Sequence, residues 1–212
     1  MINEVIESIR EKLYKNTNIQ QLSSARTLEL SEELNRFLNF QMRVSKSLPA
    51  DYSHSNVHEN AVRNILEVAL KEKFDLPDPF SDRLLNGRIW YDMDIVLFLL
   101  ASISKKYGND AVEYMGELVP DKCIFPESIQ SFNDAIQNLN RIYYMNHKTN
   151  VYIGEYLPYM ESKNQIQLFC NTAHYPAAYN HGIIKGLSKK FNQSLKLSIA
   201  SRNHGGEFKI VN

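Results

Sequence analysis

The stretch from Gln165 to Phe191 reads QIQLFCNTAHYPAAYNHGIIKGLSKKF and joins a strand pattern to a helix pattern. Its first part alternates polar and apolar residues, which is typical of a half-buried strand, and we expect that strand to run to Asn171. After Pro176 the apolar residues recur at helical spacing, with Gly182 and Gly186 on one face. Because a glycine lacks a Cβ, this pattern predicts a helix that lies close against a sheet.

The segments around this stretch follow a simple order, with helices first and strands afterwards. Helical periodicity predicts helices at residues 2–14, about 24–44, 59–76, 94–107, 110–115 and 127–145, the fifth of them ended by Gly116 and Pro120. Strands are expected at residues 151–159, 165–171, 194–199 and 207–211. Helices followed by an antiparallel β-β-α-β-β arrangement predict the α+β fold class.

Composition excludes several classes of protein. The chain has 24 basic and 24 acidic residues, so net charge gives no reason to expect capture of nucleic acid or of an anionic membrane. Its two cysteines are too few for a disulfide framework. The longest apolar run, residues 95–103, is far shorter than the roughly 20 residues of a spanning helix, and the N-terminus lacks the basic region of a signal peptide. We therefore expect a soluble, cytoplasmic protein.

Residues 45–57 read SKSLPADYSHSNV, a serine-rich segment with a proline and no periodicity. Such a segment is typical of a linker and a domain boundary. We expect a helical hairpin at residues 1–45, a linker at 46–57 and a second domain at 58–212. His54 and His58 have no cysteine or carboxylate cluster beside them, so no metal site is predicted there.

The hairpin resembles a known family. Its first helix contains IESIREKL at residues 6–13 and its second contains LELSEELNRFL at residues 28–38. Both segments resemble the small aspartyl-phosphate phosphatases of the sporulation phosphorelay, whose signature in the second helix is S-Q-E-L-D. The resemblance implies a response regulator, or its sensor kinase, as the partner. It also implies Ser31, Glu32 and Asn35 as the catalytic positions, because a polar side chain there can orient a water for in-line attack on an acyl phosphate.

The signature is changed at two positions. Glu32 stands where the family has Gln, and Asn35 stands where it has Asp. An amide can still hold a water, so the hairpin could act as a phosphatase or could only dock a partner. A third interpretation is that the hairpin is a homodimer interface, because two helices alone bury little surface.

The second domain resembles the heme-nitric oxide/oxygen-binding (H-NOX) sensor family over residues 58–212. The phrases that carry this resemblance, in chain order, are WYDMD at 90–94, KYG at 106–108, EYMG at 113–116, QNLNRIY at 137–143 and GIIKGL at 182–187. The related vinyl-reductase-like ligand-sensing domains share the pattern of the C-terminal half and stay an alternative. Either resemblance implies a ligand pocket between the helices and the sheet.

The family's heme residues are altered. The proximal histidine position falls on Tyr143, with His147 one helical turn later, and the propionate-binding motif Y-x-S-x-R falls on residues 170–174, CNTAH. Loss of the arginine removes a bidentate carboxylate clamp that a neutral histidine does not replace. The resemblance thus predicts ligand-binding positions at Tyr143, Cys170, Thr172 and His174, the last three on one face of a strand. The altered heme residues favour a pocket without heme, which is either filled by side chains or takes an apolar ligand. The alternatives are a heme-based gas sensor in which Tyr143 or His147 binds iron, and a polar cluster with a structural role.

Together these observations predict a bacterial signalling regulator, in which a sensor domain controls a hairpin that binds, and could dephosphorylate, a response regulator. A sensor-adaptor without catalysis is the second interpretation.

Overall fold

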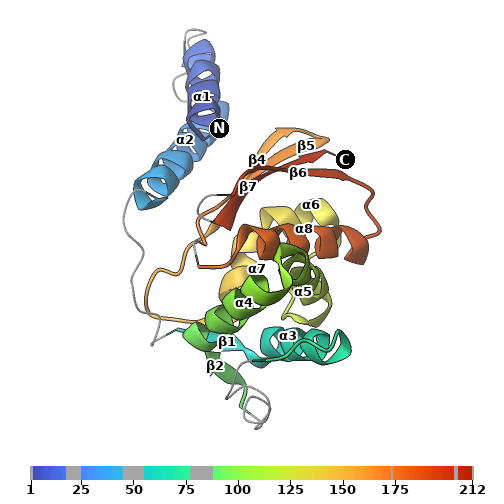
Figure 1. The fold of residues 1–212 in the computed structure, drawn as a ribbon. Helices are drawn as coiled ribbons and strands as arrows, with labels where there is room; N and C mark the ends of the chain where they lie inside the picture. Colours follow the sequence, from blue (N-terminus) through green and yellow to red (C-terminus); the bar gives the residue numbers. More distant parts are fainter. Residues whose placement is uncertain are drawn as a thin grey trace. The chain divides into compact units, whose positions relative to one another are not determined.

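The computed structural model describes residues 2–17, 25–44, 55–76, 88–172, 174–202 and 205–211. The chain divides into two compact units, Met1–Ser47 and Leu48–Asn212. Figure 1 shows the helices and strands of each unit, and their arrangement confirms the predicted α+β class. None of the described helices is both long enough and apolar enough to cross a bilayer.

The first unit is a pair of helices, α1 (Ile2–Thr17) and α2 (Ala25–Val44). They run antiparallel, since the side chain of Gln41 near the end of α2 donates a hydrogen bond to that of Asn3 at the start of α1. Apolar residues that recur every three or four positions form the buried seam between the helices; they are Val5, Ile6, Ile9, Leu30, Phe37 and Phe40. The predicted hairpin is therefore confirmed.

The second unit begins its helices with α3 (Glu59–Lys71), α4 (Met93–Tyr107) and α5 (Asn109–Lys122). The prediction of a short helix that ends at Gly116 is wrong, because α5 continues through Gly116 and has Pro120 in its last turn. Helix propensity disfavours both residues there, glycine by about 1 kcal/mol. Tertiary packing of Gly116 against another helix outweighs that preference.

That other helix is α8 (Ala177–Lys190), and glycines set its distance from α5. A Cβ added to a glycine at the crossing would meet a backbone carbonyl oxygen of the opposite helix at 2.0, 2.1 and 2.2 Å for Gly182, Gly186 and Gly116, respectively. No real Cβ approaches an oxygen so closely, so a larger residue at any of these positions would force the two helices apart. The predicted close contact of the two α8 glycines exists, but they face a helix and not the sheet.

Ion pairs flank the glycine contact between α5 and α8. The Lys185 ammonium lies 2.6 Å from the Glu113 carboxylate, and His181 Nδ1 lies 2.9 Å from its other oxygen. Lys189 pairs with Glu117 one turn further along. Partial burial by itself would raise the pKa of Glu113, but hydrogen bonds from Lys185 and His181 outweigh it and lower that pKa. Glu113 is therefore ionised at neutral pH and pairs with the ammonium of Lys185.

The predicted helix at residues 127–145 is two helices, α6 (Phe132–Gln137) and α7 (Leu139–Met145). The first begins late because Ser131 is its N-cap, accepting a hydrogen bond from the Asp134 N–H at 3.1 Å. Asn138, with φ −100° and ψ 9°, separates the two helices. The break turns the residues of α7 toward the cavity described below.

The main sheet has four antiparallel strands in the order β4-β5-β7-β6. Its strands are β4 (Tyr156–Ser162), β5 (Gln165–Cys170), β6 (Lys196–Ser201) and β7 (Gly206–Val211). Pro158 lies inside β4, which is an edge strand, so its missing N–H removes no bond from the interior of the sheet. The predicted β-β-α-β-β order is confirmed, although the first strand begins at Tyr156 and not at residue 151.

A second, smaller sheet was not predicted. It joins β1 (Asn56–His58), β2 (Trp90–Asp92) and β3 (His147–Lys148) in the order β2-β1-β3. Val57 in the middle of β1 is buried and pairs with His147. The end of the predicted linker, residues 56–57, thus lies in this sheet, whereas residues 45–54 lie outside the described part of the chain.

Candidate functional site

The exposed side of α2 carries the predicted catalytic residues. Glu32 and Asn35 are exposed and Ser31 is half-buried. Leu28, Glu32, Asn35, Asn39 and Met42 are spaced by four, three, four and three residues, so they form one stripe along the helix. We call these five residues the α2 stripe. It lies away from the buried seam and presents polar groups in its centre.

The two ends of the α2 stripe are apolar. The exposed fraction is 62% for Leu28 and 59% for Met42. Single exposed apolar residues are common, but two that bracket polar residues on one helix face form a surface that another protein can cover. The α2 stripe therefore has an apolar side chain at each end, suited to anchoring a partner, and the polar residues predicted to be catalytic between them.

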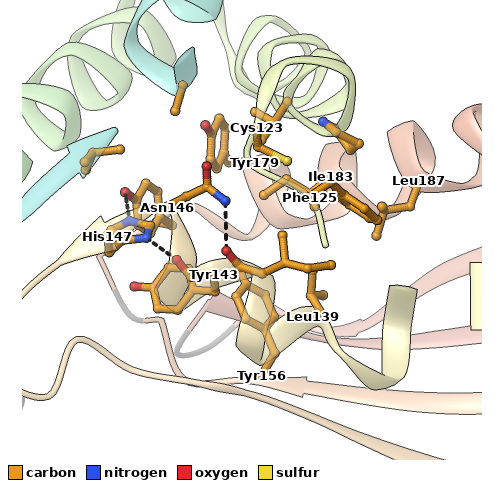
Figure 2. A pocket seen from close by; sticks show the side chains of 16 residues that line it. Cys123, Phe125, Leu139, Tyr143, Asn146, His147, Tyr156, Tyr179, Ile183 and Leu187 are labelled. Atoms are coloured by element: carbon orange, nitrogen blue, oxygen red, sulfur yellow. Dashed lines mark hydrogen bonds between the residues drawn. The ribbon is translucent and has the colours of Figure 1, made fainter. Parts of the chain in front are cut away.

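A cavity of about 60 Å³ lies inside the second unit. Its lining comes mainly from α5, the segment that follows it, α7 and α8, as Figure 2 shows. The lining residues are Val57, Ala61, Val119, Pro120, Cys123, Phe125, Leu139, Ile142, Tyr143, Asn146, His147, Tyr156, Tyr175, Tyr179, Ile183 and Leu187. Most of these side chains are aliphatic or aromatic, so the wall is apolar.

The polar groups that α7 and β3 contribute to this wall are hydrogen-bonded to other groups of the protein. The Tyr143 hydroxyl donates to the Ile153 carbonyl oxygen at 2.9 Å. His147 Nδ1 lies 2.7 Å from the Tyr143 carbonyl oxygen, and its Nε2 lies 2.8 Å from the Tyr175 hydroxyl (Figure 2). Because a carbonyl only accepts, Nδ1 carries the proton, and Nε2 accepts from Tyr175. Both nitrogens of the neutral ring are occupied.

Burial keeps the titratable groups of the cavity uncharged. It lowers the pKa of His147 to about 4, against a smaller opposing effect of the hydrogen bond to Tyr143. Burial raises the pKa of Tyr156, Tyr175 and Tyr179, and it raises the pKa of Cys123 to about 11. At neutral pH the histidine, the cysteine and the three tyrosines are therefore uncharged, and they contribute only neutral polar groups to the wall.

A buried hydrogen-bond cluster lies behind the cavity and is centred on Asn180 of α8, which is 1% exposed. Its Oδ1 accepts from the Tyr156 hydroxyl at 2.7 Å. Its Nδ2 donates to Thr172 Oγ1 at 3.0 Å and to the Gly205 carbonyl oxygen at 2.7 Å. Asn180 thus ties α8 to β4 and to the segments that follow β5 and precede β7.

The structure separates the four predicted ligand-binding residues. Tyr143 lines the cavity. Cys170 ends β5 opposite Tyr156, and Thr172 belongs to the Asn180 cluster. His174 lies in a turn beyond the strand, so the prediction that Cys170, Thr172 and His174 share one strand face is wrong. The strand ends at Cys170 because the chain there turns to meet Asn180, a contact without a local sequence signal.

Sequence reasoning missed Tyr175, Tyr179 and Asn146 as lining residues. Tyr175 and Tyr179 lie on either side of Pro176, where helix α8 begins, and their rings stack with centroids 5.4 Å apart. Their spacing of four residues was the available signal, because it places two aromatic rings on one side of the helix start. Asn146 gave no such signal. Its side chain accepts a hydrogen bond from the Ile124 N–H and donates one to the Ile124 carbonyl oxygen, and these contacts are distant in sequence.

The residues present do not fit heme in this conformation. The Tyr143 hydroxyl and both nitrogens of His147 are used in hydrogen bonds within the protein. A cavity of about 150 Å³ is known to hold benzene, whereas this one measures about 60 Å³ and a porphyrin is several times larger than benzene. Among the described residues, no cluster of three or more His, Cys, Asp or Glu side chains could hold a metal ion.

Comparison with known families confirms both resemblances. Residues 2–43 match the family described as Spo0E-like sporulation regulatory protein. No curated protein matches the chain. The match covers the hairpin, so the similarity to this family lies in the first unit.

Solved H-NOX structures resemble this chain in fold. The H-NOX protein from S. oneidensis in the Fe(II)NO ligation state is 14% identical, with 72% of this chain and 97% of that chain covered and a TM-score of 0.50. A Cs H-NOX mutant with the unnatural residue 4-cyano-L-phenylalanine is 16% identical, and the match covers 73% of this chain and 95% of that chain with a TM-score of 0.51. An Fe(II) unliganded H-NOX mutant from K. algicida is 13% identical, and the match covers 73% of this chain and 95% of that chain with a TM-score of 0.52. Identity this low shows the fold alone. The similarity of the hairpin to sporulation regulatory proteins supports a signalling protein.

Proposed function

We propose that this chain is a signalling regulator whose hairpin binds the receiver domain of a phosphorylated response regulator. The observation that carries the proposal is the α2 stripe, which presents Glu32 and Asn35 to solvent within a segment matched as Spo0E-like over residues 2–43. The second unit, with its H-NOX fold and its internal cavity, supplies the sensor in this proposal.

The docking surface follows from the geometry of α2. From Leu28 to Met42 the stripe extends about 21 Å along the helix, at about 1.5 Å per residue. This length is enough for one helix to cross the mouth of a receiver's phosphorylation site and contact apolar surface on either side. Leu28 and Met42 anchor the helix, because burial of a large apolar side chain contributes about 1.5–3 kcal/mol.

Asn35 has the chemistry required to orient a water. Its amide provides both a donor and an acceptor, so it holds a water without acting as a base. In the proposed step the water oxygen forms a bond to phosphorus while the bond between phosphorus and the aspartate oxygen breaks. The electron pair leaves with the aspartate carboxylate, and both protons of the water stay with the released phosphate. Correct positioning supplies most of the rate effect in such reactions.

Glu32 and Ser31 have supporting roles in this proposal. Both lie within one helical turn of Asn35, and Glu32 is exposed beside it. We assign them contacts to the polar rim of the receiver site. Occupancy of the cavity in the second unit then changes how readily the α2 stripe reaches the receiver.

The test is to incubate the full chain with a phosphorylated receiver domain and to follow both binding and loss of the phosphoryl group. We expect Asn35→Ala to abolish dephosphorylation while binding is retained. The matched control is Asn39→Ala, which removes the same amide one turn along the α2 stripe and should leave the rate constant of the bound complex unchanged.

Other outcomes have distinct meanings. Binding without dephosphorylation by the unmodified protein would identify a sensor-adaptor. Equal rates for Asn35→Ala and the unmodified protein would remove Asn35 from catalysis. Absence of binding to any phosphorylated receiver, together with a dimeric mass in solution, would replace the proposal with the dimer interpretation.

A further inference from the structure

The cavity of the second unit exposes almost no polar atom to a bound molecule. The hydroxyls of Tyr143 and Tyr156 donate to Ile153 and Asn180, respectively. The Asn146 side chain also has its partners within the protein, since it donates to the carbonyl oxygens of Ile124 and Ile142 and accepts from the Ile124 N–H. A molecule in the cavity would therefore contact aliphatic carbon and the faces of aromatic rings.

The cavity also lacks a charged group with which an ion could pair. Its histidine is held neutral with both ring nitrogens hydrogen-bonded, and its lining contains no lysine, arginine, aspartate or glutamate among the described residues. Transfer of an ion from water into such a site costs several kcal/mol of desolvation, and no charged partner in the wall compensates for it. The electrostatics therefore exclude ionic ligands.

The size of the cavity limits the ligand further. A volume of about 60 Å³ is above the minimum of roughly 10–15 Å³ for one water and below the roughly 150 Å³ of a cavity that holds benzene. Apolar cavities of this kind stay dry and bind apolar gases or small hydrocarbons. Molecules with a few heavy atoms fit directly, and a benzene-sized molecule requires the wall to move.

The wall has a side through which such a molecule can enter. Cys123, Phe125 and Ile183 line the cavity and are only half-buried. The Lys190 ammonium lies over the Phe125 ring, 5.4 Å from its centroid, and 3.8 Å from the Asp121 carboxylate, so a lysine side chain covers this edge. Entry by this edge therefore requires movement of side chains.

From these observations we propose that the cavity is a binding site for a small, neutral, apolar molecule, bound without heme or metal. This inference rests on the sensor role proposed for the second unit and specifies its class of ligand. Its test uses no response regulator, so a failure here is distinguishable from failure of the proposed hairpin function.

The experiment records methyl and amide NMR spectra of the full chain with dissolved xenon as the probe, and then with benzene. We expect xenon to shift the methyl resonances of Leu139, Ile142 and Leu187, which line the cavity. Ala61→Leu places a larger side chain in the cavity and should abolish these shifts. The matched control, Ala101→Leu on the exposed side of α4, should retain them.

A second variant covers the case in which Ala61→Leu does not fold. Val119→Ala enlarges the cavity from its half-buried edge, and benzene should then bind more tightly, by about fourfold for each methylene-sized volume gained. Unchanged benzene affinity would overturn the proposal, and so would xenon shifts that are absent or equal in Ala61→Leu and the unmodified protein. A sharp Soret band after incubation with hemin, lost in His147→Ala, would overturn it in favour of a heme site.

Discussion

Replacement of Gly186 by alanine tests the helix crossing on which the cavity depends. In an unconstrained helix this substitution stabilises, because alanine exceeds glycine in helix propensity by about 1 kcal/mol. At the crossing, however, the new Cβ would lie 2.1 Å from the Glu117 carbonyl oxygen and 2.9 Å from Pro120 Cδ. Propensity and packing therefore act in opposite directions at one residue.

The magnitude follows from the separation required. Relief of the contact with Glu117 from 2.1 Å to an ordinary 3.4 Å requires α8 to move by about 1.3 Å from α5. Insertion of one methyl into a packed core costs about 1–3 kcal/mol, and we take the upper end because the methyl meets backbone atoms and not a flexible side chain. With the gain in propensity subtracted, we expect a net destabilisation of about 2 kcal/mol. For a domain of this size, that loss lowers the melting temperature of the second unit by roughly 4–8 °C.

The assay is thermal and urea unfolding of the full chain, followed by circular dichroism and by tryptophan fluorescence from Trp90. Ser188→Ala is the control, since it changes propensity on the same helix without adding an atom. A stabilisation by Gly186→Ala, comparable to what an isolated helix would show, would refute the close crossing of α5 and α8.

Two further predictions concern the buried polar groups. The folded protein holds the imidazole of His147 neutral down to its pKa of about 4, whereas the unfolded chain binds a proton near the ordinary value of 6.5. Stability should therefore fall as the pH is lowered through this window, by at most about 3 kcal/mol, and the fall should be smaller in His147→Asn. An NMR titration that places the His147 pKa near 6.5 would contradict this assignment. Asn180→Ala should destabilise by about 2–4 kcal/mol in urea titrations, because it leaves Tyr156, Thr172 and Gly205 without buried partners. Asn150→Ala, at an exposed asparagine, should change stability by less than about 0.5 kcal/mol, and equal effects of the two substitutions would contradict the Asn180 assignment.

Local patterns were enough to predict much of this fold. The alternation at residues 165–170 and the apolar period of α8 each matched one element, because both elements have one buried side and one exposed side. The hairpin was predictable for the same reason. Such patterns identify an element, but they do not identify what it packs against.

The errors arose where distant residues decide the structure. Gly116 is a helix breaker by propensity, yet it is required inside α5 because Tyr179 of α8 lies against it. The small sheet escaped prediction because strands of two or three residues, such as β3, are too short to show a period. Tyr143 was predicted to bind a ligand, and it lines the cavity. Asn180 was not singled out, because its partners are 8–25 residues away along the chain.

Strand β1 has a consequence for the coupling that we propose between the two units. Val57 lines the cavity and pairs with His147, and Ser55 just before it is completely buried, with its hydroxyl 2.8 Å from that of Thr149. The polypeptide that arrives from the hairpin is therefore anchored in the cavity wall by its first described residues. In the proposed coupling, a widening of that wall at Val57 would displace Ser55, the first described residue after the hairpin, through covalent bonds. The covalent route between cavity and hairpin thus begins at a residue that a bound molecule would touch.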